Sequence, residues 1–374
     1  MIEYVQVRNA SFATIGIIDT AKSIIWHKSY YSVGDFEIYA QATAMHVDLL
    51  VRGNYITRLN DDEIGVIEKV EISQNAQDGL MIVASGRFAK SILERRIIYN
   101  LSGKVNKATI LRGNVESAAR ALVANNAISC TFNTKRNISA LQLGAHSGST
   151  KIIVDGNGNA TQKQVTNDNL LAYTDALLQE YLMSAKIVLS SDETKLEYKC
   201  FEGIDRSMNN SSGIDAIIFS SDFDNLIDSD YLTDDTGLRN MALIGGEGEG
   251  IERFYSSIES ADTGLARREI FIDASSISQT YEDDNDQEQT YTDAEYKAML
   301  DARGKLQLAQ MIQVESFSGT INTAFGNWLL NRDYSLGDIV TIQNNQIGIY
   351  ANVRIIDTTE VEDENGYSVS LNYE

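Results

Sequence analysis

The stretch Phe12–Ala40, FATIGIIDTAKSIIWHKSYYSVGDFEIYA, predicts three short β-strands and decides the fold class. Phe12–Asp19 is apolar and rich in β-branched residues, and Ser23–Tyr31 runs from apolar to aromatic residues. Apolar and polar residues alternate in Asp35–Ala40, as in a strand that buries one face. A glycine–aspartate pair supplies turn chemistry before this last strand. The opening of the chain is therefore predicted to be β-structure.

Outward from this stretch, the pattern divides the 374 residues into three parts. Residues 1–100 continue as β-structure, and residues 214–374 return to short strands with a helix near 292–310. Between them, residues 101–213 mix helical and strand patterns, as in a small inserted α/β domain. The sequence thus predicts a mainly β fold with an α+β insertion.

Three helices are predicted from apolar spacing and from capping residues. Asn114 is a suitable N-cap for a helix over residues 115–123. A second helix is expected over Asp168–Ala185, where large apolar residues recur on one face. The third helix, over 292–310, contains Gly304, which weakens it by about 1 kcal/mol relative to alanine.

Turns and loops are predicted from glycine, asparagine and acidic residues, because the chain contains no proline. Asp78–Gly79 and Asn365–Gly366 are expected to be hairpin turns. The string GGEGEG at 245–250 lacks the lysine of a phosphate-binding loop, and we interpret it as a tight β-turn. The acidic stretch Gln279–Tyr291 is expected to be an exposed loop.

The charge balance argues against nucleic acid as a specific partner. The net charge is −22, so the mean field repels nucleic acid and anionic membranes, and it suits either solubility or a channel along which DNA slides. The N-terminus is not a signal peptide, and no apolar run approaches the ~18 residues of a membrane span. We expect synthesis in a cytoplasm and no membrane insertion.

The sequence predicts no catalytic, cofactor or metal site. His27, His46 and His146 do not form an HExxH motif, and there is no GxSxG motif. The two cysteines, Cys130 and Cys200, suggest neither a disulfide framework nor a metal cluster. The acidic stretch near 283–286 lacks the glycine of a calcium loop. We therefore expect no enzyme activity and no cofactor.

Aromatic residues near the opening strands are candidate interface residues. Trp26, Tyr30, Tyr31 and Phe36 could form a platform for a sugar, but their strand spacing favours packing in a core or an interface. We take the stretch 26–31 to be exposed and to contribute to association between copies.

Two further sites complete the candidate interface. Arg95 and Arg96 lie between apolar residues, and we expect them to pair with acidic residues of this chain or of a neighbour. Asp338 belongs to a glycine–aspartate pair that weakly echoes Gly34–Asp35 at the other end of the chain. We predict that copies associate through the two β-rich ends.

Six segments resemble the siphophage tail-hub family, whose members lie at the distal end of phage tail tubes. The segments are SIIWHKSYYSVGDFEIYA (23–40), GVIEKVEIS (65–73), SGRFAKSILERRII (85–98), NMALIGGEGEGIERF (240–254), REIFIDASSIS (268–278) and YSLGDIVTIQNNQIGIYANVRIID (334–357). The middle part, 101–213, carries no such resemblance.

The resemblance implies a baseplate hub similar to the central hub of contractile phage tails. Such hubs are trimers in which each chain contributes two β-barrel-like tube domains to a pseudo-sixfold ring. The ring docks on the tail tube or the distal tail protein, leads to a spike, fibre or other baseplate protein, and conducts DNA or the tape-measure protein. Because the chain ends at Glu374 directly after a predicted strand, we expect a bare hub without a lysin.

Two other functions remain open from the sequence. A carbohydrate- or receptor-binding tail-tip module would use aromatic faces and the middle domain. A tail-associated cell-wall hydrolase would need a catalytic motif, and none is found.

Overall fold

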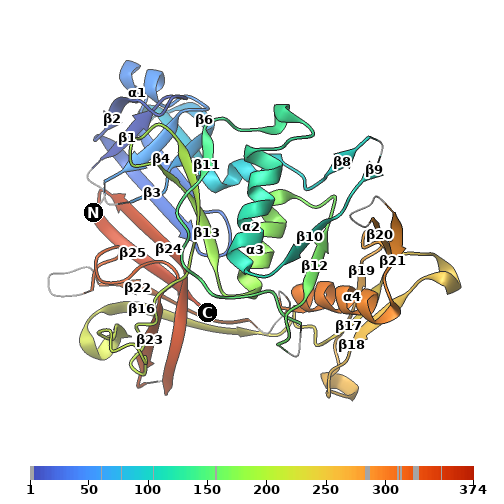
Figure 1. The fold of residues 1–374 in the computed structure, drawn as a ribbon. Helices are drawn as coiled ribbons and strands as arrows, with labels where there is room; N and C mark the ends of the chain where they lie inside the picture. The colour runs from blue at the N-terminus through green and yellow to red at the C-terminus, as the bar shows by residue number, and fades with distance from the viewer. Residues whose placement is uncertain are drawn as a thin grey trace.

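Strands from both ends of the chain share one large sheet in the structure, a computed structural model (Figure 1). This sheet lies on the left of Figure 1, and the remaining elements lie to its right. The structure describes residues 4–59, 61–76, 78–103, 105–155, 158–282, 287–309, 311, 314–322, 328–346 and 348–374.

The large sheet has thirteen strands. They are β1 (Val5–Arg8), β2 (Thr14–Ile18), β3 (Ala21–Ser29), β4 (Asp35–Gln41), β5 (Tyr55–Arg58), β6 (Gly65–Asn75), β7 (Gly79–Phe88), β15 (Ile218–Ser220), β16 (Leu226–Asp234), β22 (Val314–Ile321), β23 (Ile339–Asn344), β24 (Ile349–Asp363) and β25 (Gly366–Tyr373). The main path is β16-β22-β25-β24-β3-β4-β7-β6-β5-β1-β2, and β23 branches from β24 and pairs with β15. The prediction of a mainly β fold with an α/β insertion is confirmed.

The predicted opening strands form because their alternate residues are buried. In β3 and β4, Trp26 and Phe36 are directly opposite each other, and both side chains are buried in the core. The adjacent strand β7 is joined to β6 by the predicted turn at Asp78–Gly79, where Gly79 adopts a φ of 79°. The sequence therefore specifies this half of the sheet locally.

The seam between the two halves of the sheet is the pairing of β24 with β3. The first part of β24 pairs with β23, and its second part pairs with β25 and β3. A register shift between Ile355 and Asp357 separates the two parts. Among the described strands, β2 and β16 have a neighbour on one side, so the path is open. The barrel-like shape of two tube domains stays a prediction.

The middle region forms a smaller α/β unit to the right of the sheet in Figure 1. Its elements are the helical turn η1 (Ala89–Arg95), β8 (Leu101–Ser102), β9 (Val105–Asn106), β10 (Thr109–Arg112), α2 (Val115–Val123), the π-helical turn η2 (Ala124–Ile128), η3 (Thr134–Arg136), β11 (Leu141–Leu143), β12 (Gln162–Val165), α3 (Leu170–Glu180), β13 (Ser184–Leu189) and β14 (Leu196–Phe201). The Asn114 side chain accepts a hydrogen bond from the Ser117 amide, so the predicted N-cap of α2 is confirmed.

Helix α3 is shorter than predicted. It ends at Glu180, and Leu182 adopts a left-handed φ of 53° with a half-exposed side chain. The chain reverses there, because the Met183 amide bonds back to the Leu178 carbonyl. Apolar residues continue up to Ala185 and favour a longer helix, but Ser184–Leu189 is strand β13. Strand β13 pairs with β14 as an antiparallel hairpin.

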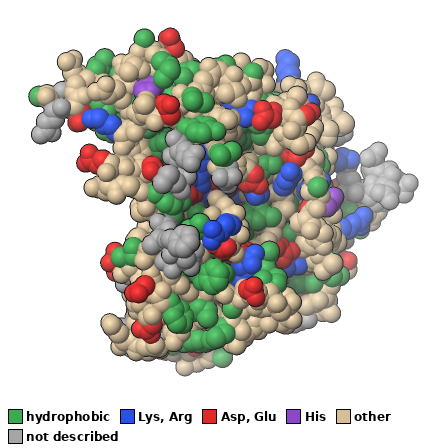
Figure 2. Space-filling model, turned by 90° about the vertical axis from the view of Figure 1, so that its left-hand side faces the viewer, with side chains coloured by type: hydrophobic (Ala, Val, Ile, Leu, Met, Phe, Trp, Pro, Cys, Tyr) green, Lys and Arg blue, Asp and Glu red, His purple; other side chains and the backbone are tan. Residues whose placement is uncertain are grey.

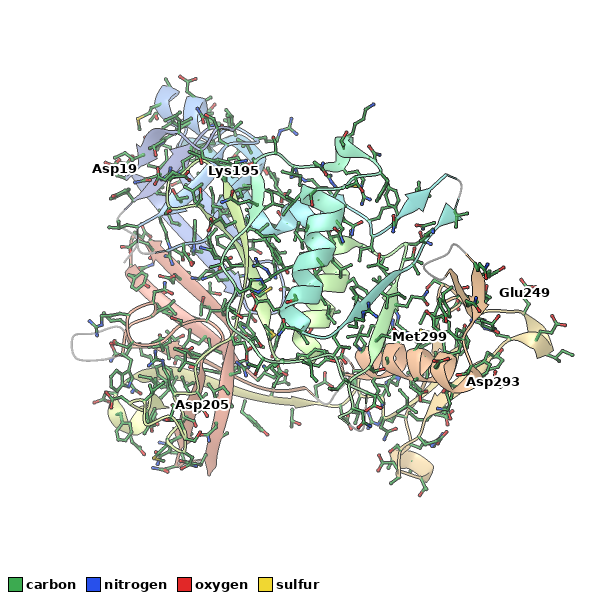
Figure 3. All side chains as sticks on the ribbon, in the orientation of Figure 1. Asp19, Lys195, Asp205, Glu249, Asp293 and Met299 are labelled. Atoms are coloured by element: carbon green, nitrogen blue, oxygen red, sulfur yellow. The ribbon has the colours of Figure 1, made fainter. Side chains whose placement is uncertain are left out.

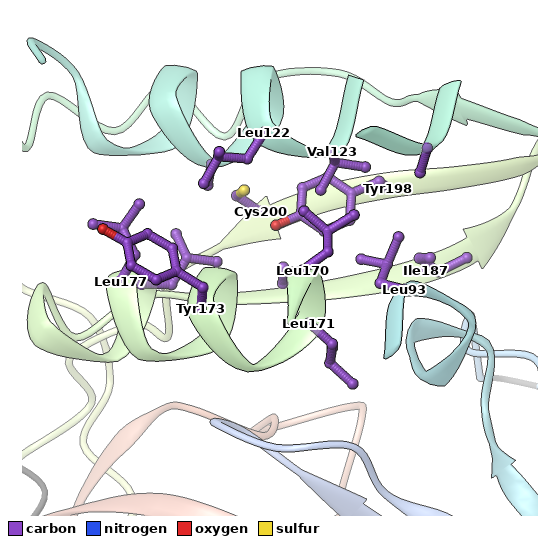
Figure 4. Packing of buried hydrophobic residues seen from close by; sticks show 14 of the residues in the cluster. Leu93, Leu122, Val123, Leu170, Leu171, Tyr173, Leu177, Ile187, Tyr198 and Cys200 are labelled. Atoms are coloured by element: carbon purple, nitrogen blue, oxygen red, sulfur yellow. The ribbon is translucent and has the colours of Figure 1, made fainter. Parts of the chain in front are cut away.

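Helices α2 and α3 pack against β13 and β14 around one hydrophobic cluster (Figure 4). Leu122 and Leu170 from the two helices meet Tyr198 from the sheet. Leu93, which precedes the predicted boundary at 100/101, belongs to the same cluster. The core of the middle region thus extends into residues assigned to the N-terminal part. The division into 1–100, 101–213 and 214–374 stays a prediction.

A further unit, here called the outer unit, lies at the lower right of Figure 1. Its elements are β17 (Met241–Gly245), η5 (Gly250–Glu252), β18 (Tyr255–Ile258), η6 (Gly264–Ala266), β19 (Glu269–Asp273), β20 (Thr280–Glu282), β21 (Glu288–Thr290) and α4 (Asp293–Leu308). Figure 3 shows Asp293 and Met299 on α4, with Glu249 farther out. The predicted third helix is confirmed, and Thr292 and Glu295 form a capping box at its start.

Gly304 has a packing role in α4. A β-carbon at this position would lie 2.7 Å from Ile258 Cδ1 and 2.8 Å from Ile244 Cδ1. The glycine therefore lets the helix approach β17 and β18 closely, which offsets its low helix propensity.

Two predictions in the outer unit are wrong in detail. The string 245–250 does not form one tight turn, because the connection from β17 to β18 runs over 246–254 and includes η5. Gly246 is required by packing, since an added β-carbon would lie 2.5 Å from Tyr296 Oη. The predicted exposed loop Gln279–Tyr291 contains the hairpin β20–β21, in which the Tyr281 and Tyr291 rings pack at a tilt with centroids 4.5 Å apart. Residues 283–286 lie outside the described residues.

The remaining elements complete the two ends of the chain. Helix α1 (Ala44–Leu49) follows β4, and the helical turn η4 (Ser221–Phe223) precedes β16. The predicted turn at Asn365–Gly366 joins β24 to β25, with Gly366 at a φ of 106°. One hydrophobic cluster gathers Tyr30, Phe219 and Tyr373 from both ends of the chain.

Candidate functional site

The central strands of the large sheet present a polar face. On β25 the exposed residues are Ser368, Ser370 and Asn372, and on β4 they include Asp35 and Glu37. The residues between them in each strand are mostly buried, so one face packs on the core and the other is solvated. Figure 2 looks onto this side of the molecule, where charged side chains of both signs and groups of hydrophobic side chains lie among the other residues.

A histidine crosses the seam on the polar face. His27 on β3 lies 3.6 Å from a carboxylate oxygen of Asp35 on β4 and 3.6 Å from one of Asp357 on β24. A hydrogen bond to Asp357 and the charge of Asp35 raise the pKa of His27, although burial opposes the rise. Three strands are thus linked by charge when His27 is protonated.

A buried charge network lies on the core face of the same seam. Asp61 accepts hydrogen bonds from Arg58 at 2.9 Å and from the Trp26 indole at 3.1 Å, and Lys28 lies 3.0 Å away. The Asp61 side chain has no exposed surface. Burial alone would raise the pKa of Asp61, but Lys28 and Arg58 bring it far below its usual range. Asp61 is therefore ionised and holds two buried cations.

Arg58 extends the network to the C-terminal half of the sheet. Its guanidinium also pairs with Glu360 on β24, and Glu360 accepts a hydrogen bond from the Tyr367 hydroxyl on β25. The side chains of Arg58 and Glu360 are each 5% exposed. Arg58 and Glu360, 302 positions apart in the sequence, thus link the two halves of the sheet on its core face. The sequence pattern did not indicate this pairing.

A cavity of about 590 Å³ opens beside this network. Glu63 lies in the wall of this cavity. Burial raises the pKa of Glu63 to about 7, and the charge of Lys28 limits the rise. The wall also includes Asp62, Lys186, Glu202 and Asp338. The cavity lies where the N-terminal strands, β13–β14 and the loop before β23 meet. Charges of both signs line it.

The aromatic residues that could have formed a sugar platform are mostly buried, in agreement with the core packing that their strand spacing favoured. Trp26 and Tyr30 have no exposed surface and Phe36 is 1% exposed, whereas Tyr31 is half-buried. Trp26 packs against Phe36, with ring centroids 5.8 Å apart, and Tyr30 packs edge-on against Tyr31. The expected exposure of 26–31 is therefore wrong for these rings, because alternate strand residues face the core. They offer no surface for a sugar, and their place at an interface between copies stays a prediction.

Arg95 and Arg96 lie at the end of η1. Arg95 is exposed and pairs at 3.7 Å with Glu68 of β6. Arg96 donates from Nε to the Arg136 carbonyl at 2.9 Å, and the Arg136 guanidinium stacks on the Tyr99 ring at 3.9 Å. The predicted intrachain ion pairing is present for Arg95, and a contact with a neighbouring copy stays a prediction.

Asp338 is a buried structural residue. It accepts hydrogen bonds from the Ile204 amide at 2.7 Å, from Arg206 Nε at 2.9 Å and from the Ser335 amide at 3.0 Å. Asp35 differs, because its side chain is 61% exposed on the polar face. The two glycine–aspartate pairs therefore do not share one local role, and the interface role of Asp338 stays a prediction.

The two edges of the sheet path carry exposed apolar residues. Ile15 and Ile17 of β2 are 43% and 44% exposed. Ile227, Tyr231 and Leu232 of β16 are 61%, 46% and 54% exposed. An edge strand that exposes apolar side chains favours association with another chain. Sequence reasoning missed these residues, because an edge is defined by strand order alone.

The described residues hold no group of three histidine, cysteine or acidic side chains placed to bind a metal ion. Cys130 and Cys200 are buried and free. Within the same described residues, no helix is long and apolar enough to cross a bilayer.

A second cavity, of about 490 Å³, lies between the middle region and the outer unit. Its wall combines hydroxyl and amide side chains with Val105, Ala108 and Ile110, and it also includes Tyr281 and Glu288 of the β20–β21 hairpin. The polar lining residues include Asn106, Gln164, Thr166, Ser276, Ser278 and Thr280. Such a wall can donate and accept hydrogen bonds to a neutral polar ligand.

Comparison with protein families finds one that covers nearly the whole chain. The model described as Siphovirus ReqiPepy6 Gp37-like protein matches residues 4–372. None of the curated protein sequences compared with the chain matches it.

Two solved structures share the fold over their whole lengths. A tail protein from Neisseria meningitidis MC58 is 12% identical, with a TM-score of 0.58 over 99% of this chain and 95% of that chain. The 43 kDa tail protein of prophage MuSo2 from Shewanella oneidensis is 12% identical, with a TM-score of 0.56 over 100% and 98%. At this identity the likeness concerns the fold alone.

Proposed function

This chain belongs to the Siphovirus ReqiPepy6 Gp37-like protein family, and from that premise we propose that it is a phage tail structural protein and a baseplate hub. Three copies form a ring at the distal end of the tail. The ring joins the sixfold tail tube, or the distal tail protein, to the threefold tip. The observation that carries this proposal is the large sheet built from both ends of the chain, whose strand path is open among the described strands.

The open edges support a ring of copies. One edge strand, β2, and the other, β16, lie at opposite ends of the strand path, and both expose apolar side chains. A contact between two different edges is heterologous, and such contacts close into a ring when the rotation between copies allows it. If β16 of one copy pairs with β2 of the next, both edge strands are covered in the ring.

The polar face suits the wall of a channel. Its exposed hydroxyl, amide and acidic side chains give neither an apolar nor a basic surface to which DNA would adhere. With a net charge of −22, the chain repels the phosphate backbone. We assign this face to the lumen, through which DNA and the tape-measure protein pass.

The remaining partners follow from this assignment. The ring would contact spike, fibre or other baseplate proteins below, and the chain would be made in the host cytoplasm before assembly into the virion. The proposal includes no enzyme activity.

Light scattering tests the oligomeric state that the proposal requires. Over a range of concentrations, we expect a species of about three times 41.4 kDa. Electron microscopy of that species should show a ring with a central opening. A chain that stays monomeric at all concentrations would contradict the hub assignment.

Carbohydrate binding at the tail tip is a second candidate function, favoured by the hydroxyl-lined cavity of about 490 Å³. We expect binding of neutral glycans on an array if this function is real, with loss of the signal in Gln164→Ala. A glycan array without any signal would exclude it, and the trimer measurement would be unaffected.

A further inference from the structure

The cavity of about 590 Å³ beside the buried charge network combines charged and apolar wall residues. Ile204 and Leu336 contribute aliphatic side chains, and Asn331 and Ser335 contribute polar ones. A cavity of this size can hold a long side chain or a small organic molecule. The charges in its wall therefore decide which ligand it can accept.

Most of the acidic side chains in the wall already have a cation. Five of the described acidic residues line the cavity, and four of them form ion pairs within the chain. The pairs are Asp61 with Lys28, Asp62 with Lys186, Glu202 with Lys151 and Asp338 with Arg206, with nitrogen–oxygen distances of 3.0, 2.6, 2.7 and 2.9 Å. These four carboxylates are neutralised without a ligand.

Glu63 is the fifth acidic residue, and it differs from the others. Within the described part of the chain, its carboxylate accepts no hydrogen bond and forms no ion pair. Lys28 and Lys186 lie near enough to favour its ionised form, but each of them is already paired with another carboxylate. An ionised Glu63 thus leaves one negative charge in the wall without a partner, which is costly away from bulk water.

The backbone holds Glu63 in place at the cavity. Its amide donates a hydrogen bond to Asp61 Oδ1 at 2.9 Å, and Glu63 forms an antiparallel bridge with Val188 of β13. The next residue, Ile64, has no exposed surface. Glu63 itself is half-buried and lines the cavity, so a ligand there can reach it. A binding group fixed in this way loses little conformational freedom when a ligand binds.

The neighbours of Glu63 keep their charges near neutral pH. Burial alone would raise the pKa of Asp61, but Lys28 and Arg58 bring it far below its usual range. Burial alone would lower the pKa of Lys28, but the charges of Asp61 and Glu63 raise it. Because burial raises the pKa of Glu63 to about 7, this carboxyl group is the one of the three that changes charge between pH 6 and pH 8.

We propose that the cavity binds a small organic cation, an alkylammonium or alkylguanidinium group, which pairs with Glu63 and packs its alkyl part against Ile204 and Leu336. This site goes beyond the hub function and does not depend on how copies associate. Such a cation reaches the cavity either as a free amine or as a lysine or arginine side chain of a partner protein. The chemistry is the same in both cases, and the test separates the two sources.

The test measures binding of n-butylammonium to the full chain by ligand-observed NMR titration, with 1-butanol as the uncharged analogue. We expect a Kd on the order of 1–10 mM at pH 8, in keeping with the small size of the probe, and no binding of the alcohol. Because the cation binds ionised Glu63, binding should weaken by about tenfold at pH 6. The probe stays charged at both pH values.

Two variants test the site, and one serves as the control. Glu63→Gln keeps the side-chain shape, and it should weaken binding at least tenfold and abolish the pH dependence. Ser335→Phe keeps Glu63 but narrows the cavity, and it should also weaken binding. Glu71→Gln removes a carboxylate that is 58% exposed on β6, outside the cavity, and it should bind like the wild type. Circular dichroism checks that each variant is folded.

A capped peptide with one lysine between glycine and serine residues distinguishes the sources. Binding of this peptide at least tenfold tighter than n-butylammonium supports a partner side chain, and equal or weaker binding supports a free amine. A wild-type chain that binds no n-butylammonium at pH 8 would overturn the proposal. Equal binding by the wild type and Glu63→Gln would also overturn it, and the trimer measurement would be unaffected in either case.

Discussion

The two faces of the seam between β3 and β24 hold the same strands together by different means. On the core face, Arg58, Asp61 and Glu360 form a charge network with almost no exposed surface. On the polar face, His27 lies between Asp35 and Asp357 in contact with solvent. A buried network is costly to break because it leaves an unpaired charge, whereas an exposed one is weakened by water and salt. The seam should therefore depend far more on its inner face.

The largest effect is expected from Arg58→Met. The substitution keeps much of the side-chain length but leaves Glu360 without its cation inside the core. We expect the free energy of unfolding to fall by about 3–5 kcal/mol. Denaturant titration measures this directly. A loss below about 1 kcal/mol would show that the inner network does not hold the seam.

Glu360→Gln is a gentler test of the same network. The amide keeps one acceptor oxygen for Arg58, its NH2 group can donate to the Tyr367 hydroxyl oxygen in place of the lost acceptor, and the charge is lost. We expect a loss of about 1–3 kcal/mol, smaller than that of Arg58→Met. If the order of the two losses were reversed, Glu360 rather than Arg58 would be the central member.

His27→Gln tests the outer face through its pH dependence. Because the folded-state pKa of His27 is raised above its usual 6.5, protonated His27 stabilises the fold below about that pH, and the contribution disappears as pH rises through the raised pKa. The free energy of unfolding of the wild type should exceed that of the variant by up to about 1 kcal/mol at pH 6, and the two values should be equal at pH 9. A stability difference between wild type and variant that increases with pH would contradict a stabilising role of protonated His27.

The smallest effect is expected from Arg87→Met, on β7. Arg87 pairs with Glu68 at 2.8 Å and with Glu94 at 2.7 Å, but its side chain is 39% exposed. We expect a loss below about 1 kcal/mol that shrinks further in high salt. A loss of unfolding free energy that does not depend on salt and equals that of Arg58→Met would contradict the expected difference between buried and exposed charge pairs.

The sequence predicts the local features of this fold well. The alternation around Trp26 and Phe36, the capping residue Asn114, the start of the third helix near Thr292, and the turn at Asn365–Gly366 depend on a few neighbouring residues, and each is confirmed. Where local signals conflict, prediction fails. The apolar residues that follow Glu180 continue a helical pattern, but the chain turns and they enter a strand.

The candidate assembly surface could not be read from the sequence. The pairing of β3 with β24 joins Trp26 to Glu360, and no pattern near either residue specifies the other. The exposed Ile17 and Ile227 become edge residues only because of the strand order. Burial of Trp26 and Asp338 likewise depends on distant partners. Long-range pairing thus determines which residues are left for assembly.

The central claim is that β2 of one copy lies beside β16 of the next in a closed ring of three. The most direct test is cross-linking of the double variant Ile17→Cys with Ile227→Cys by a short bismaleimide, since both positions are exposed and the native cysteines are buried. The account predicts a covalent ladder on a denaturing gel that ends at three chains, and it predicts no trimer band in either single variant. Products that stop at one chain, or that extend beyond three, would contradict it.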